Sequence, residues 1–65
     1  MTKFSASLKR LREEKELKQS QVAEKLGLPV STYANWEQGR RHPDIEQIYN
    51  LIAIFEVDAN ELFDI

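Results

Sequence analysis

The apolar residues of this chain recur at the three- and four-residue spacing of amphipathic helices, and no stretch alternates as a half-buried strand does. Phe4, Leu8 and Leu11 follow this spacing and predict a first helix over roughly 3–15. A second helix is predicted over 19–26. The residues that it should turn toward the core are Val22, Ala23 and Leu26.

Residues that favour breaks separate the second helix from a third. Gly27 stands where a helix C-terminus favours a left-handed residue. Pro29 cannot donate a backbone hydrogen bond, but it is tolerated at a helix start. A third helix is therefore predicted from about 30 to 38, and Gly39 should end it.

Two capping patterns predict a fourth and a fifth helix. Asp44 should cap the fourth helix with Gln47 as its capping-box partner, and Asp58 with Glu61 repeats the pattern before a short fifth helix. The stripe expected to face the core from the fourth helix is Ile45, Ile48, Leu51, Ile52 and Phe55. The fifth helix carries Leu62 and Phe63. Five short helices with tight connections predict one compact all-α domain over residues 1–65.

The charges are distributed unevenly along the chain. Residues 1–43 hold all nine basic residues and five acidic ones, whereas residues 44–65 hold six acidic residues and no basic one. The overall net charge of −2 hides this polarity. It therefore does not exclude a polyanionic partner, provided that the basic residues form one face of the domain.

The chain lacks the residue groups that enzymes and metal sites require. It has no cysteine, which excludes disulfides and thiolate metal sites and fits a reducing cytoplasm. His42 is the only histidine, and no base adjoins Ser31 or Thr32 to make a nucleophile. No signal-peptide pattern or run of membrane-spanning length occurs. We therefore expect a cytoplasmic protein that is not an enzyme and holds no cofactor.

The third predicted helix has two unlike sides when it is projected at about 100° per residue. Tyr33, Trp36 and Glu37 fall on one side and should pack on the first two helices. The opposite side lacks lysine and glutamate, which solvated faces usually carry. It consists of Ser31, Ala34, Asn35 and Gln38, with Val30 at its border.

Short uncharged side chains of this kind suit the base edges of DNA. Asn and Gln can bond adenine, Ser can donate or accept, and Ala or Val can touch the thymine methyl. Lys18 precedes the second helix, and Arg40 and Arg41 follow the third, where phosphate contacts would be needed. The alternative for the helix alone is an ordinary polar surface, and the flanking cations favour DNA.

Taken together, the motifs resemble the λ-repressor-like helix-turn-helix family, also called the Cro/cI or XRE type. The resemblance covers about residues 4–63, and no single piece of it is specific. It begins with Leu8-x-x-Leu11-Arg12 and Leu17-x-Gln19-x-x-Val22-Ala23-x-x-Leu26-Gly27. It continues with Ser31-Thr32-Tyr33-x-x-Trp36-Glu37-x-Gly39, Pro43, Leu51 and Phe55. The resemblance implies a five-helix domain whose second helix lies across the DNA backbone and whose third enters the major groove.

The resemblance also implies roles for individual residues. Tyr33 and Trp36 match core positions, and Arg12 and Glu37 match a pair that forms a salt bridge under the recognition helix. The base-reading positions are Val30, Ser31, Ala34 and Asn35. The residues expected at the DNA backbone are Lys18, Gln19, Thr32, Gln38, Arg40 and Arg41.

The sequence departs from the family pattern at four positions. Lys18 stands where Ser or Thr often caps the second helix, and Pro29 stands where a Ser that caps the third helix is common. Glu16 and Glu56 stand where glycine is frequent. None of these departures removes a position that should read DNA.

Partners other than DNA are also expected. A homodimer on an inverted-repeat operator is the usual route to specificity for so small a module. Ile54 of the fourth helix should be exposed and, with Phe63 and Ile65, forms the candidate dimer surface. A transcriptional repressor is the preferred function. The alternative is an antitoxin or another protein-interaction module that would use the acidic, apolar C-terminal part.

Overall fold

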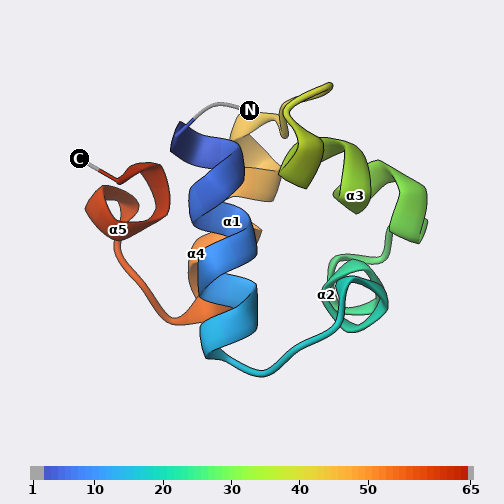
Figure 1. Cartoon of the computed structure of the whole chain (residues 1–65), viewed down its shortest axis with the longest axis horizontal. Coiled ribbons are helices and arrows are strands. Elements are labelled where there is room, and N and C mark those ends of the chain that lie inside the picture. The colour runs from blue at the N-terminus through green and yellow to red at the C-terminus, as the bar shows by residue number, and fades with distance from the viewer. Residues whose placement is uncertain (1–2, 65) are drawn as a thin grey trace.

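The five predicted helices are all present in the computed structural model, which describes residues 3–64 (Figure 1). The helices are α1 Lys3–Glu14, α2 Gln19–Leu26, α3 Val30–Gln38, α4 Ile45–Phe55 and α5 Ala59–Phe63. No strand occurs within 3–64. The prediction of an all-α five-helix domain is confirmed. None of these helices is long and apolar enough to cross a membrane.

The core lies where the five helices meet, and every helix contributes to it. Helix α1 packs on α3 and α5, while α2 packs on α3 and α4. Tyr33 and Trp36 of α3 are buried, as predicted, and their rings pack edge to face with 6.0 Å between the ring centroids. The remaining core residues are Leu8, Leu11, Val22, Ala23, Leu51, Phe55 and Leu62. This packing fixes which side of α3 is left for solvent.

Helix α4 buries a narrower stripe than its sequence predicts. Only Leu51 and Phe55 of that stripe are fully buried, and Ile45, which was expected in the core, is 66% exposed. Viewed down the axis of α4, with about 100° per residue, the Ile45 side chain points roughly 100° away from the direction midway between Leu51 and Phe55. The Ile54 side chain points only about 80° away from that direction, on the other side. The prediction that Ile54 is exposed was therefore also wrong, because its side chain is partly buried against the core.

Side-chain caps fix the starts of α4 and α5 as predicted. Asp44 Oδ1 accepts a hydrogen bond from the Gln47 backbone N–H at 2.9 Å, and Asp58 Oδ1 accepts one from Glu61 N–H at 2.8 Å. Such caps satisfy backbone donors that the first helical turn leaves free.

The departures at Lys18 and Pro29 leave α2 and α3 at their predicted starts. A lysine side chain has no acceptor, but the Lys18 backbone N–H donates to Gln21 Oε1 at 2.8 Å, so one half of a capping box remains. Pro29 has extended backbone angles and α3 begins at the next residue.

Glu16 and Glu56 both adopt the left-handed conformation in which glycine is common, with φ of 57° and 55°. The glycine frequent at these two positions in the family therefore has a backbone reason in this fold.

Candidate nucleic-acid interface

A tight turn holds α2 and α3 in fixed relation. Gly27 is left-handed at φ 72°, and its N–H returns to the carbonyls of Ala23 and Glu24. Leu28 N–H donates to the same Ala23 carbonyl at 3.0 Å. These bonds end α2 and turn the chain within three residues, so α3 starts directly at Val30.

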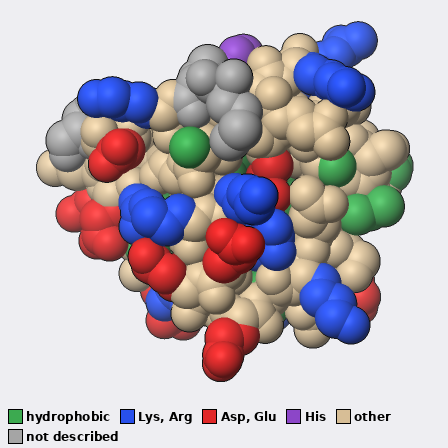
Figure 2. All heavy atoms as spheres, viewed as in Figure 1, with side chains coloured by type: hydrophobic (Ala, Val, Ile, Leu, Met, Phe, Trp, Pro, Cys, Tyr) green, Lys and Arg blue, Asp and Glu red, His purple; other side chains and the backbone are tan. Residues whose placement is uncertain are grey.

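The solvent side of α3 carries the side chains that the helical projection assigned to it. Val30 is 46% exposed, and Ser31 and Gln38 are exposed as well, while Ala34 and Asn35 are half-buried. Helix α3 lies at the periphery of the domain (Figure 1). In Figure 2, uncharged and hydrophobic atoms occupy the surface over its N-terminal part. This face presents hydrogen-bonding and methyl groups without a net charge.

Exposed cations flank this face. Lys18 precedes α2, and Arg40 and Arg41 follow α3. The loop after α3 is tied down, because the backbone N–H groups of both arginines donate to the Asn35 carbonyl, at 3.0 and 3.4 Å. Figure 2 shows Lys and Arg side chains beyond the end of α3, and acidic side chains over α5 on the opposite side. Over the middle of this view basic and acidic side chains lie side by side, whereas beyond the end of α3 only basic side chains are visible.

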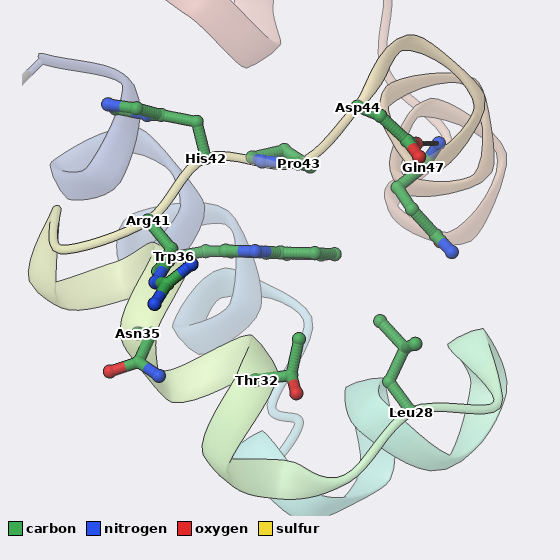
Figure 3. Close-up of a pocket in the computed structure, with 9 residues that line it drawn as sticks. All are labelled: Leu28, Thr32, Asn35, Trp36, Arg41, His42, Pro43, Asp44 and Gln47. Atoms are coloured by element: carbon green, nitrogen blue, oxygen red, sulfur yellow. Dashed lines mark hydrogen bonds between the residues drawn. The ribbon is translucent and has the colours of Figure 1, made fainter.

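A hollow between α3 and the start of α4 brings three of the predicted site residues together (Figure 3). Thr32 and Asn35 border it from α3, and Arg41 borders it from the loop. The ring of Trp36 forms part of its wall, so this core residue also touches the candidate interface. Sequence reasoning did not associate this hollow with Gln47, which comes from α4 and lies twelve positions after Asn35.

Arg12 and Glu37 form a two-point ion pair between α1 and α3. Arg12 Nε donates to Glu37 Oε2 at 2.6 Å, and Arg12 Nη2 donates to Oε1 at 3.1 Å. The Glu37 side chain is 3% exposed and that of Arg12 is 13% exposed. Arg12 Nη1 also donates to the Leu17 carbonyl at 2.9 Å. The pair therefore links α1, the turn before α2, and α3.

Gln19, which was expected at the DNA backbone, joins this network. Its Nε2 donates to Glu37 Oε1 at 3.1 Å, and the side chain is half-buried at the first position of α2. An amide has two N–H donors, so Gln19 retains one that can point to a ligand. Pattern reasoning missed the contact with Glu37 because eighteen residues separate the two.

Burial and hydrogen bonds shift the pKa of the buried Glu37 carboxylate in opposite directions. Burial by itself would raise the pKa of Glu37, but hydrogen bonds from Arg12 and Gln19 outweigh it and lower that pKa. The hydrogen bond to Glu37 raises the pKa of Arg12, which stays charged. Burial raises the pKa of Tyr33, whose hydroxyl makes no hydrogen bond within residues 3–64 although Glu37 is nearby.

The structure leaves neither of the two described dimer candidates fully exposed. Ile54 is half-buried, and Phe63 is half-buried with its ring stacked on Phe4 at 5.1 Å. Ile65 lies outside the described residues. The large apolar side chains that are most exposed on α4 are instead Ile45 and Tyr49, at 66% and 67%.

Comparisons with known proteins agree with this architecture. A helix-turn-helix family model matches residues 8–62. The chain is 37% identical over 59 residues to a Bacillus subtilis protein named uncharacterized HTH-type transcriptional regulator YqaE. It is 34% identical over 59 residues to the cryptic phage CTXphi transcriptional repressor RstR of Vibrio cholerae. Each match covers 91% of this chain, but only 51% and 53% of the respective relative.

A solved structure supports the same assignment. The crystal structure of a transcriptional regulator from Listeria innocua superposes with a TM-score of 0.84 at 37% identity, and covers 91% of this chain and 55% of that one. The present chain thus spans about half the length of each of these three proteins. It belongs to the helix-turn-helix family of the XRE or Cro/cI type, a family of DNA-binding transcriptional regulators and not of enzymes.

Proposed function

We propose that this chain binds a specific duplex DNA operator in the cytoplasm and represses transcription from it. The observation that carries the proposal is the solvent face of α3, which offers short uncharged donors, acceptors and methyl groups between flanking cations. In this proposal the base-reading residues are Val30, Ser31, Ala34 and Asn35. A protein bound over a promoter excludes other proteins from it, and one relative carries the name of a repressor.

The residues around this face would position the domain on the DNA backbone. Lys18, Arg40 and Arg41 supply charge, whereas Gln19, Thr32 and Gln38 supply neutral donors. The backbone bonds from Arg40 and Arg41 to Asn35 would keep these cations at the end of α3. Phosphate contacts made here would orient α3 without reading the sequence.

Replacing a backbone-contacting cation should weaken binding equally on all sequences. We expect Arg40→Ala or Lys18→Ala to reduce the slope of log K against log salt by about one unit, because one fewer counterion is displaced. Fluorescence anisotropy of a labelled duplex at several salt concentrations measures this slope. If either variant changed base preference and left the slope unchanged, its phosphate assignment would be wrong. A chain that served only as a protein adaptor would shift no duplex at any salt concentration.

The proposal also includes a homodimer on an inverted repeat. A two-fold dimer presents two copies of α3 to half-sites about 34 Å apart, one turn of DNA. The surface that we propose lies on the C-terminal part, around Phe63 and the partly exposed side of Ile54, with Ile65 beyond the described residues. Such a surface is small, so we expect pairing to become complete only on DNA.

Phe63→Glu should remove cooperative binding to a duplex with two half-sites, while binding to one half-site persists. The matched control is Ile45→Glu, which places the same charge at a more exposed residue of α4. Sedimentation with and without duplex measures the assembly. Thermal unfolding must accompany it, because Phe63 also stacks on Phe4. If Phe63→Glu folded and still bound cooperatively, or if only Ile45→Glu removed cooperativity, the dimer surface would lie elsewhere.

A further inference from the structure

Helix α4 carries an apolar stripe that the other described helices leave exposed. Ile45 and Tyr49 are its two most exposed large apolar side chains, and Ala53 is exposed as well. These residues follow one another at intervals of four, so they are neighbours along one side of the helix. Single exposed apolar side chains are ordinary, whereas a contiguous row of them is typical of a surface that binds a partner. We call Ile45, Tyr49 and Ala53 the α4 stripe.

The α4 stripe faces away from the hollow that borders α3. The Gln47 side chain extends from α4 into that hollow (Figure 3). With about 100° per residue, Ile45 and Tyr49 each point about 160° away from Gln47. The two surfaces therefore lie on opposite sides of α4. A duplex held against α3 would leave the α4 stripe open to another molecule.

Acidic side chains surround the α4 stripe. Asp44 and Glu46 at its start and Glu56 at its end are exposed, and none of them forms an ion pair with another residue of 3–64. Residues 44–65 contain no basic residue that could offset them. The surroundings of the α4 stripe therefore carry negative charge that only a partner can compensate.

This charge argues against a second copy of the chain as the occupant. Two α4 stripes packed on each other would bring their acidic residues together, and like charges across an interface weaken it. Helix α2, which packs on α4, carries Glu24 and Lys25, whose charges offset each other. An anionic lipid surface would be repelled for the same reason. The occupant that fits is apolar in its centre and basic at its edges.

We infer that the α4 stripe docks an amphipathic helix of another protein, whose apolar side chains are flanked by lysines or arginines. Tyr49 and Ile45 would pack against the apolar side of that helix, and Glu46 and Glu56 would face its cations. The inference goes beyond DNA binding and does not depend on it. A domain that binds DNA through α3 could hold such a partner at the same time.

A stapled amphipathic peptide tests this inference, because staples keep a short helix folded in water. The probe carries leucines at helical spacing with lysines on both flanks, and a second peptide has glutamates in place of the lysines. We expect saturable binding of the lysine peptide to the full chain by fluorescence anisotropy. Amide NMR shifts should be confined to the α4 stripe and its neighbours. The glutamate peptide should bind much more weakly.

Tyr49→Ala should weaken binding of the lysine peptide by at least about tenfold, because tyrosines in the centre of an interface contribute strongly. The matched control is Asn50→Ala, at the exposed residue that follows Tyr49 and points about 100° further round the helix. This control should bind the peptide as the parent does. The melting temperature should change little in either variant, because both side chains are exposed.

Glu46→Lys tests the contribution of charge. This variant should weaken binding of the lysine peptide and strengthen that of the glutamate peptide, each by roughly twofold to fivefold, as exposed ion pairs do. Equal binding of the two peptides by the parent would show an unselective apolar surface and overturn the inference.

The other occupants would be recognised by different results. Concentration-dependent sedimentation that Tyr49→Ala removes would assign the α4 stripe to a second copy, and duplex binding lost in Tyr49→Ala would assign it to DNA. Either result would overturn the inference, as would no saturable binding of the lysine peptide. If the parent bound the peptide but no duplex, the proposed function would fail and this inference would stand.

Discussion

Removing either partner of the Arg12–Glu37 pair should lower the free energy of unfolding by about 3–5 kcal/mol, because the remaining charge is left buried without its counterion. The geometry supports a large effect, since two hydrogen bonds join the side chains and Glu37 is 3% exposed. Replacing both residues, as in Arg12→Met with Glu37→Leu, should be nearly neutral by comparison. A domain this small has little stability to spare, so the single variants should unfold at a much lower urea concentration than the parent chain.

Urea unfolding of the two single variants and the double variant, followed by circular dichroism, measures this effect. The matched control is the exposed pair Arg10 and Glu14, where Glu14→Ala should cost less than about 1 kcal/mol. Losses below about 1 kcal/mol in both buried single variants would contradict the prediction, because they would equal those of a surface pair.

The same pair gives the domain a pH dependence with a definite sign. The pKa of Glu37 is lower in the folded state than in the unfolded chain. The charged Glu37 therefore stabilises the fold at pH above the ordinary glutamate pKa of about 4.3, and this stabilisation is lost as the pH falls through the lowered pKa of the folded state. The double variant lacks this group and should lose less stability in acid. If the parent and the double variant lost the same unfolding free energy on acidification, the pH dependence would come from other carboxylates and not from Glu37.

Asn35→Ala should reduce affinity for the preferred operator by about 1–3 kcal/mol and relax base preference at one position. The bonds that Asn35 makes to the loop use its backbone carbonyl, which alanine retains, so the change removes only the side-chain amide. Because Val30, Ala34 and Asn35 suit thymine methyls and adenine, we expect that position to be an A·T pair.

Titration of the preferred duplex and of single-substitution duplexes measures this relaxation. Asn60→Ala is the matched control, since Asn60 is an exposed asparagine on α5, which lies on the other side of the domain from α3 (Figure 1). The salt slope should stay constant in both variants, which distinguishes base reading from phosphate contact. Unaltered affinity and preference in Asn35→Ala would show that α3 does not present this side chain to a base.

The helices of this domain could be predicted from sequence because local chemistry determines them. Gly27 and Gly39 end α2 and α3 in the left-handed conformation, and Asp44 and Asp58 cap α4 and α5. The two faces of α3 followed from its periodicity alone. These features depend on residues within one helical turn of each other.

Features that depend on neighbouring helices could not be predicted in the same way. The helical period places Ile45 and Ile54 on opposite sides of the buried Leu51 and Phe55 in α4. Only the packing of the neighbouring helices decides that Ile45 is exposed and that Ile54 is partly covered. The bond from Gln19 to Glu37 and the hollow between α3 and the start of α4 join residues that are distant in sequence. No local pattern encodes these contacts.

Selection of binding sites from random duplex DNA tests the central claim, that α3 reads base edges, most directly. It would be run in parallel with the parent chain, Asn35→Ala and Arg40→Ala. We expect the parent to enrich an inverted repeat with A·T pairs in each half-site. Asn35→Ala should lose preference at one position per half-site, whereas Arg40→Ala should enrich the same repeat more weakly. No enriched sequence for the parent, or an identical one for Asn35→Ala, would contradict the claim.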